Sequence, residues 1–281
     1  MLSIIIPTLN EEKYIKVCLN SIKKQAFNCE YEVIVADANS KDKTIDIAKS
    51  FGCRITSGGL PAKGRNEGAK IAKGDIFLFM DGDTILPDGF LEKSISEFKK
   101  RNLDIAGFPL IPYKGNKFFK FGFNLFFNWF PARFAGEALP YSISSILVKK
   151  EMHQKIGGFD ESIKTSEDNF YGREGGKVGR FGLIKSSYIL FSTRRFDRDG
   201  LFCTLFEQGR CETHIVLFGK ITSKSFNYQF GNYKKKNKIL KEIIAFIGFM
   251  LFWPLFALTV VVKVFLIKIK KQYVNLFASK N

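Results

Sequence analysis

Apolar stretches alternate with amphipathic stretches over the first hundred or so residues of the chain. The segments Leu2 to Ile6, Tyr31 to Ala36 and Ile76 to Met80 are short and mostly apolar, which is typical of strands buried on both faces of a sheet. Between such segments, apolar residues recur at helical spacing, as they do from Asp88 to Lys100. This alternation predicts an α/β fold in which helices flank a mostly parallel sheet.

Acidic residues follow two of these predicted strands. Asp37 follows the second strand, and Asp81 and Asp83 follow the strand that ends at Met80. Ligands of parallel sheets bind beyond the carboxyl ends of the strands, so we expect these side chains at one edge. Carboxylates in an Asp-x-Asp pattern suit Mg²⁺ or Mn²⁺, which can hold a diphosphate and stabilise its charge as it leaves. Taken alone, Asp-Gly-Asp is also consistent with a solvated turn.

Five ordered motifs extend this pattern over roughly the first 180 residues. They read SIIIPTLNEEKYI, EVIVADANSKDKT, GRNEGAKIAKGD, FLFMDGDTILPDG and GGFDESIKTSED. Together they resemble the motifs of the family 2 glycosyltransferases, which have the GT-A fold. The resemblance implies a metal-dependent, inverting glycosyltransferase that uses a nucleoside diphosphate sugar and Mg²⁺ or Mn²⁺. The family's usual Asp-Gly-Ser turn after the second strand is replaced here by Asp37-Ala38-Asn39-Ser40.

The resemblance also implies roles for individual residues on the donor side. Pro7, Thr8 and Glu11 line the nucleoside pocket in this interpretation, and Asp37 holds the base or ribose. Asp81 contacts the ribose and Asp83 binds the metal, with Asp81 as a second candidate metal ligand. These residues form the predicted nucleotide-sugar site.

Several basic side chains are candidates for binding phosphate. Arg65, with Lys63 nearby, would face the pyrophosphate, because arginine forms bidentate, charge-assisted bonds to phosphate oxygens. Arg194, Arg195 and Arg173 are candidate contacts for the diphosphate or for an acceptor phosphate. Solvated surface charges are the alternative for each of these basic residues.

Glu167 and Asp168 form an acidic pair late in the chain. The resemblance places the catalytic base at this pair, and we assign the removal of the acceptor proton to Asp168. The alternative is a charge pair at a helix N-terminus capped by Ser166. A lipid phosphate acceptor would need no strong base, because its second ionisation has a pKa of about 6. Asp168 would then position the acceptor.

The formal net charge of +17 is concentrated near the C-terminus. From Lys224 onward the chain has eleven lysines and one acidic residue, Glu242. These lysines flank Ile243 to Val262, a run of 20 uncharged residues that would be about 30 Å long as a helix, the thickness of a bilayer core. We therefore expect a C-terminal apolar membrane helix that spans the membrane or lies in it. A buried core helix is the alternative.

The expected organisation has two parts. A catalytic domain covers 1–222, with a nucleotide-binding half over about 1–112 and an acceptor half over about 113–222. A basic and apolar membrane-attachment segment covers 223–281. The basic flanks predict a cell membrane location with the catalytic domain on the cytoplasmic side.

Aromatic residues crowd the stretch from Lys117 to Phe134, where basic side chains are interleaved with them. Such a mixture suits the headgroup boundary of a membrane, so we expect membrane lipid as a partner and a lipid-linked or lipid-phosphate acceptor, or otherwise a saccharide. A Phe-rich core helix is the alternative. The sequence has no motif for binding nucleic acid, so we expect no nucleic acid partner.

Two other functions compete with sugar transfer. A nucleotidyltransferase would carry a Gly-rich, basic phosphate loop after its first strand, and Pro7-Thr8-Leu9-Asn10 occupies that place here. A non-catalytic membrane scaffold with the GT-A fold would keep the motifs without activity. The five cysteines have no CxxC spacing and there are only two histidines, which argues against a zinc site or a Ser-His-Asp triad.

Overall fold

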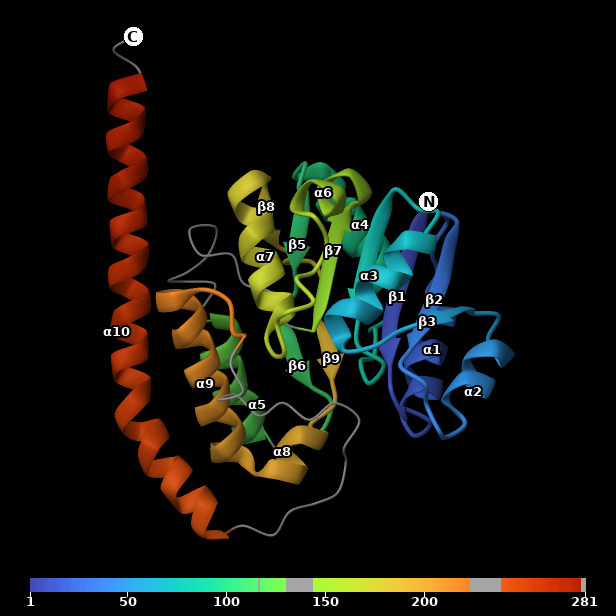
Figure 1. Cartoon of the computed structure of the whole chain (residues 1–281), viewed down its shortest axis with the longest axis horizontal. Coiled ribbons are helices and arrows are strands. Elements are labelled where there is room, and N and C mark those ends of the chain that lie inside the picture. The colour runs from blue at the N-terminus through green and yellow to red at the C-terminus, as the bar shows by residue number, and fades with distance from the viewer. Residues whose placement is uncertain (116, 130–143, 223–238, 279–281) are drawn as a thin grey trace.

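One central sheet organises the protein in the computed structural model, which describes residues 1–115, 117–129, 144–222 and 239–278 (Figure 1). Within these ranges the sheet has seven strands in the order β3-β2-β1-β4-β7-β5-β8, and a second small sheet pairs β6 with β9. The strands are β1 (Leu2–Thr8), β2 (Tyr31–Asp37), β3 (Arg54–Ser57), β4 (Ile76–Met80), β5 (Ile105–Gly107), β6 (Leu110–Pro112), β7 (Ser145–Lys149), β8 (Phe181–Leu183) and β9 (Ile189–Phe191). The predicted α/β architecture with a mostly parallel sheet is confirmed.

Strand direction decides which residues meet at the functional edge of the sheet. β1 pairs in parallel with both β2 and β4, and Thr8 lies opposite Asp37 at the end of the β1–β2 ladder. β7 runs antiparallel to β4, with Ser145 opposite Met80. The start of β7 therefore lies at the edge where the parallel strands end.

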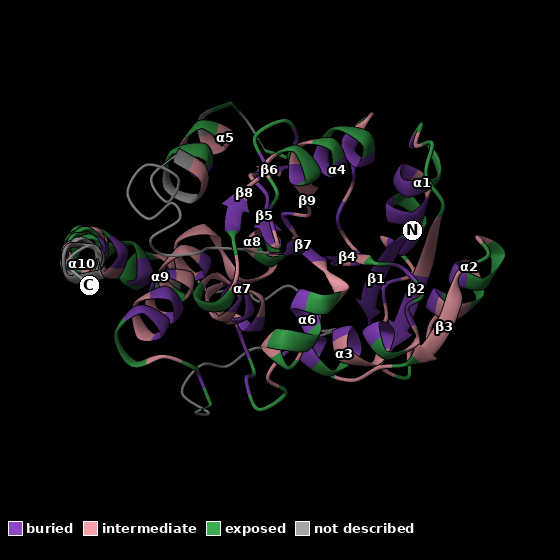
Figure 2. Ribbon diagram, turned by 90° about the horizontal axis from the view of Figure 1, so that it is seen from above, coloured by how far each residue is buried: buried purple, intermediate pink, exposed green. Residues whose placement is uncertain are grey.

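Helices cover both faces of the sheet (Figure 2). In this view α1 and α4 lie on one side of the strands, and α3 and α6 lie on the other. The helices are α1 (Ile15–Lys23), α2 (Thr44–Ser50), α3 (Pro61–Ile71), α4 (Phe90–Lys100), α5 (Lys117–Phe123), α6 (Lys150–Ile156), α7 (Glu167–Val178), α8 (Arg194–Asp199), α9 (Leu201–Phe218) and α10 (Ile239–Ala278). A π-helical segment, Asn124–Trp129, continues α5.

The core has two halves because alternate side chains of a strand point to opposite faces. Ile4 and Ile6 of β1 belong to the cluster that includes the apolar faces of α1 and α4. Ile5 belongs to the cluster that includes Ala62 and Ala69 of α3. All three isoleucines are fully buried, which explains why β1 reads as a continuous apolar run in the sequence.

The structure corrects the prediction for the C-terminal helix. Among the described residues, no helix combines the length and the apolar character that crossing a membrane requires, so the predicted C-terminal apolar membrane helix is wrong. The apolar run has another physical use, since α10 lies along α9 (Figure 1). Ala245 and Phe249 of α10 are buried, and Phe202 of α9 contacts the ring of Phe246 with 4.7 Å between centroids.

The described part of the aromatic stretch from 117 to 134 packs partly inward. Phe123 is buried, and its ring lies 4.8 Å from that of Phe191 on β9. Phe119 contacts the ring of Phe196 on α8 at 5.6 Å. Phe121, by contrast, is exposed. The inward rings support the core interpretation of this stretch. Residues 130–134 lie outside the described residues, and so does the C-terminal side of the expected domain boundary at 222/223.

The contact between α3 and β1 yields a test of the fold. A Cβ atom at Gly68 would lie 2.3 Å from Cγ2 of the buried Ile5 and 3.7 Å from Cγ2 of Ile34. We expect Gly68→Ala to lower the free energy of unfolding by about 1–3 kcal/mol, because overpacking forces α3 away from the sheet. Urea denaturation measures this change. The control is Gly122→Ala in α5, where an added Cβ meets nothing within 4 Å; equal stability of the two variants would contradict the close packing.

Candidate functional site

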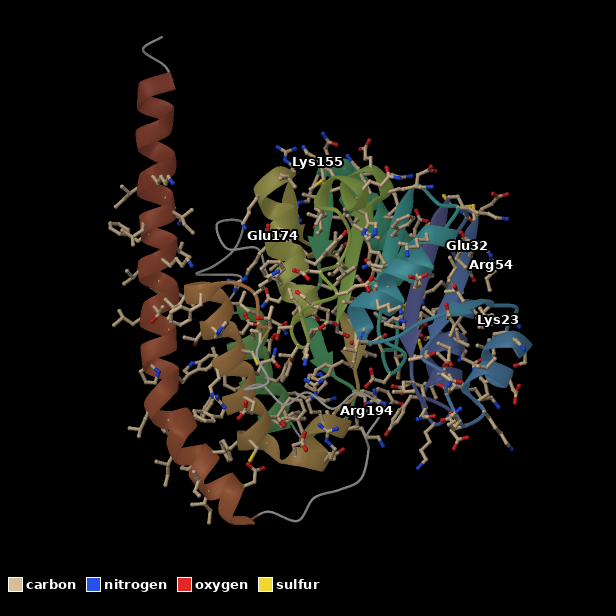
Figure 3. The ribbon with its side chains drawn as sticks, in the orientation of Figure 1. Lys23, Glu32, Arg54, Lys155, Glu174 and Arg194 are labelled. Atoms are coloured by element: carbon tan, nitrogen blue, oxygen red, sulfur yellow. The ribbon has the colours of Figure 1, made fainter. Side chains whose placement is uncertain are left out.

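A pocket lies at the sheet edge where β1 and β4 end. Nine of the predicted site residues line it, and they come from both halves of the chain. They are Pro7, Glu11, Arg65, Asp81, Asp83, Glu167, Asp168, Arg194 and Arg195. Figure 3 shows Arg194 near this edge, while Glu32 and Arg54 lie toward the opposite end of the sheet, where β2 and β3 begin.

A buried arginine connects the two halves of the pocket. Arg65 on α3 has only 2% of its side chain exposed. It donates from Nη2 to Oδ1 of Asp81 over 2.8 Å and from Nη1 to Oε1 of Glu167 over 2.5 Å. Its guanidinium also lies 5.3 Å from the ring centroid of Phe159. The two carboxylates raise the pKa of Arg65 against the lowering effect of burial, so the side chain stays charged.

Ser144 joins Asp81 to Asp168, and the sequence interpretation missed it. Its hydroxyl donates to Oδ2 of Asp81 over 2.9 Å, and its backbone N–H donates to Oδ2 of Asp168 over 2.7 Å. Ser144 lines the pocket, and its φ of +66° lies in the left-handed region. The direction of β7 could have indicated Ser144. An antiparallel strand starts at the edge where the parallel strands end, so the residue before it lies at the pocket.

Glu11, Asp83 and Arg194 form a second cluster at the donor side. Arg194 forms a bidentate salt bridge with the buried Glu11. Its Nη1 donates to Oε2 over 2.6 Å, and its Nη2 donates to Oε1 over 2.8 Å. Its Nε lies 2.8 Å from Oδ2 of Asp83. A β-bridge between Ile85 and Leu190 ties the segment after Asp83 to the strand that precedes Arg194. That bridge explains how residues so distant in sequence come together.

Asp37 stabilises the turn beyond β2. It is buried, and its Oδ1 accepts bonds from the hydroxyls of Thr8, over 2.8 Å, and Ser40, over 2.6 Å. Its Oδ2 accepts the N–H of Ser40 over 2.7 Å. Thr8 and Asp37 thus fix the loops beside the pocket without lining it, and Ser40 takes part although the sequence did not single it out as a site residue.

Two predicted phosphate contacts also lie outside the pocket lining. Lys63 is exposed on α3. Arg173 lies on α7, where it pairs with Glu212 of α9 over 3.3 Å and donates to Asn169 over 3.2 Å. The structure therefore places Arg173 in a contact between helices.

Two carboxylates that line the pocket, Asp83 and Asp168, have raised pKa values. Burial raises the pKa of Asp83 to about 7, with Arg194 opposing the shift and Glu11 adding to it. Burial also raises the pKa of Asp168 to about 7, helped by the adjacent Glu167 and opposed by Arg65. Raised carboxylate pKa values near neutrality are typical of groups that exchange protons or bind cations.

The donor atoms around Asp83 fit a metal that arrives with a diphosphate. In the described part of the chain, no three His, Cys, Asp or Glu side chains are grouped so as to hold a metal by themselves. Both oxygens of Asp81 are engaged, one by Arg65 and one by Ser144. Asp83 remains as a carboxylate ligand, and Mg²⁺ sites in enzymes often use one or two carboxylates plus phosphate oxygens.

Apolar side chains also line the pocket and form an apolar wall. It is made of side chains from β6, α5, β9 and α8, namely Leu110, Phe123, Phe191 and Phe196. The rings of Phe123 and Phe191 support each other, as do those of Phe123 and Phe196 at 6.3 Å. The pocket lining therefore combines charged side chains with apolar ones.

Comparisons with known proteins identify relatives of this chain. The chain is 27% identical over 206 residues to the poly(ribitol-phosphate) β-N-acetylglucosaminyltransferase TarS of Staphylococcus aureus, an alignment that covers 69% of this chain and 35% of that protein. The chain thus spans about a third of the length of this relative. It is 34% identical over 119 residues, 38% of this chain and 37% of the relative, to a Methanococcus voltae protein named dolichyl N-acetyl-α-D-glucosaminyl phosphate 3-β-D-2,3-diacetamido-2,3-dideoxy-β-D-glucuronosyltransferase.

A solved structure and a family model complete the comparison. The mannosyltransferase PcManGT from Pyrobaculum calidifontis, solved with GDP-Man and Mn²⁺, superposes with a TM-score of 0.60 at 17% identity, covering 93% of this chain and 73% of that one, which shows the shared fold. The model of the family described as Glycosyl transferase family 2 matches residues 3–153, more than half of the 281 residues. The chain therefore belongs to glycosyl transferase family 2.

Proposed function

We propose that the protein is a metal-dependent, inverting glycosyltransferase that moves a sugar from a nucleoside diphosphate sugar to a lipid-linked or lipid-phosphate acceptor. One observation carries the proposal. A single pocket is lined by Asp83, Arg194 and Asp168, and Ser144 bonds to both Asp81 and Asp168 within it. Such a pocket can hold a leaving diphosphate and an attacking acceptor at the same time.

The donor side provides the groups that a leaving diphosphate needs. Arg194 and Arg195 bring positive charge to the pocket, and Asp83 can anchor a divalent cation. The cation, when bound, neutralises the charge that builds up on the departing nucleoside diphosphate. The Thr8–Asp37–Ser40 network keeps the neighbouring loops in place for the nucleoside.

Asp168 is placed to accept a proton. Backbone N–H groups of Ser144 and Asn169 each donate to it over 2.7 Å, which fixes the orientation of its carboxylate. A base with a pKa near 7 is poised between its two protonation states at neutral pH. Removal of the acceptor proton as the acceptor attacks the anomeric carbon, on the face opposite the leaving group, inverts the configuration of that carbon.

The apolar wall supports a lipid-bearing acceptor. Phe123, Phe191 and Phe196 offer a surface for hydrocarbon beside charged groups that can hold a phosphate. The names of both curated relatives contain a phosphate-bearing compound, and that of the Methanococcus voltae protein includes a dolichyl group. A nucleotidyltransferase would instead release pyrophosphate, and a scaffold would bind no nucleoside diphosphate.

Replacing Asp168 tests its role as the base. We expect Asp168→Asn to reduce sugar transfer by about 10²- to 10⁴-fold, the usual contribution of a positioned base, while donor binding persists. Radiolabelled transfer from UDP- and GDP-sugars to a polyprenyl-linked saccharide, whose attacking group is a hydroxyl, measures the rate. Glu174→Gln on the same helix is the control, since Glu174 pairs with Lys177 at the surface. Full activity of Asp168→Asn would remove Asp168 from the mechanism.

The pH dependence of the wild-type rate gives a second test of the base. Asp168 accepts a proton only when it is ionised, and its pKa is raised to about 7. We therefore expect kcat/KM to rise with pH through about 7 and to level off above it. A rise centred near pH 6 would instead indicate that ionisation of the acceptor phosphate controls the rate, and that Asp168 positions the acceptor.

Donor binding can be tested at Asp83. We expect UDP or GDP with Mn²⁺ to raise the melting temperature of the wild-type protein, because a ligand at about 100 times its Kd adds about 2.7 kcal/mol of stability. Asp83→Ala should lose this metal-dependent shift and sugar transfer but stay folded, since Arg194 keeps its fork to Glu11. Asp88→Ala, an exposed position in the same loop, should behave like wild type. A scaffold would show no shift with either nucleotide.

A further inference from the structure

Arg194 occupies the position where a cation would meet Asp83. Its Nε lies 2.8 Å from Oδ2 of Asp83, and its terminal nitrogens grip Glu11. Its guanidinium also stacks 4.8 Å from the ring centroid of Tyr14. These contacts hold one guanidinium between the predicted metal ligand and the predicted nucleoside pocket.

A divalent cation and this guanidinium compete for the same carboxylate. A metal bound to Asp83 alone would face a positive charge at contact distance, so Arg194 must first leave Oδ2. Without another anion, Arg194 would lose its charge-assisted bond to Asp83 and could regain only contacts with water, although just 21% of its side chain is exposed. Free metal should therefore bind weakly.

A diphosphate changes this balance. It supplies several oxygen acceptors, and arginine binds phosphate oxygens through its planar fork. Arg194 begins α8 and follows β9, so a rearrangement of its side chain can exchange Asp83 for phosphate while the backbone stays tied by the Ile85–Leu190 bridge. The two bonds between Arg194 and the buried Glu11 can persist while the rest of the guanidinium turns from Asp83 to the phosphate.

We propose that Arg194 is a placeholder cation that couples metal binding to nucleotide binding. In the free protein it neutralises Asp83, and it moves to the diphosphate when the metal and the nucleotide enter together. The metal then binds as part of the nucleotide complex and not beforehand. This inference rests on the proposed function, because it takes a nucleoside diphosphate as the donor group.

Mn²⁺ binding to the full chain tests the coupling, with the electron paramagnetic resonance signal of free Mn²⁺ as the readout. We expect Arg194→Met to bind Mn²⁺ alone at least five-fold more tightly than wild type, within the usual range of coupling energies. We also expect it to bind UDP or GDP more weakly in the presence of Mn²⁺, because it has lost a phosphate partner. A variant with a damaged pocket would weaken both.

Two controls separate competition at Asp83 from a general change of charge. Arg195→Met removes the same charge from the same pocket lining, and we expect a smaller gain in Mn²⁺ affinity than for Arg194→Met. Equal gains would overturn the proposal. Arg198→Met, also on α8 and paired with Asp199, should leave Mn²⁺ binding unchanged.

Folding and the donor assignment are checked in the same experiment. Arg194→Met leaves Glu11 as a buried carboxylate without its fork, so circular dichroism must show a folded protein. Arg194→Lys keeps the charge but reaches both carboxylates less well, and it should shift Mn²⁺ affinity in the same direction by a smaller factor. If wild type binds neither UDP nor GDP, the proposed function fails; if it binds them and Arg194→Met leaves Mn²⁺ affinity unchanged, the placeholder role alone fails.

Discussion

The ion pairs of Arg65 are the interaction on which the rest of the site depends. A guanidinium that is 2% exposed would carry a cost of several kcal/mol if it were unpaired, and Asp81 and Glu167 offset that cost together. The pairing joins α3, the end of β4 and the start of α7, which are separated by up to 102 positions in the chain. Loss of one partner from such a buried pair typically costs about 3–5 kcal/mol. The two halves of the pocket are thus held by charge as well as by packing.

This pairing also separates the acidic residues into two groups with different chemistry. Asp81 and Glu167 face Arg65 directly, so their negative charge is balanced and their positions are fixed. Burial raises the pKa of Asp168 to about 7. The negative charge of the adjacent Glu167 adds to this rise, and Arg65 opposes it. Adjacent carboxylates on one helix therefore take different parts. Glu167 anchors the segment, and Asp168 keeps an acidity suited to proton transfer.

The sequence predicted the sheet and its acidic edge because those features depend on local pattern. Buried strands read as apolar runs, and the residues that follow them must lie at the carboxyl edge. Contacts between distant segments left no such pattern. Nothing local indicates that Arg194 meets Glu11, 183 positions away. A β-bridge between Ile85 and Leu190 brings the strand before Arg194 to this edge of the sheet. The apolar run of α10 misled for a related reason, because a long uncharged segment has the same composition whether it crosses a membrane or packs one face along another helix. Here Ala245 and Phe249 pack inward, whereas Leu251 and other apolar side chains of α10 stay exposed.

Helix α9 acts on the site through its contacts with α7, and α10 acts on it through α9. Asn169, next to Asp168, is fully buried and donates to Glu212 of α9, which also pairs with Arg173. Burial raises the pKa of Glu212, and Arg173 and Asn169 oppose that rise. At the start of α9, Glu242 of α10 accepts the N–H of Cys203 over 3.0 Å. Thus α10 steadies α9, α9 steadies α7, and α7 presents Asp168 to the pocket. The C-terminal helix thus supports the position of Asp168 through two intervening helices, without lining the pocket itself.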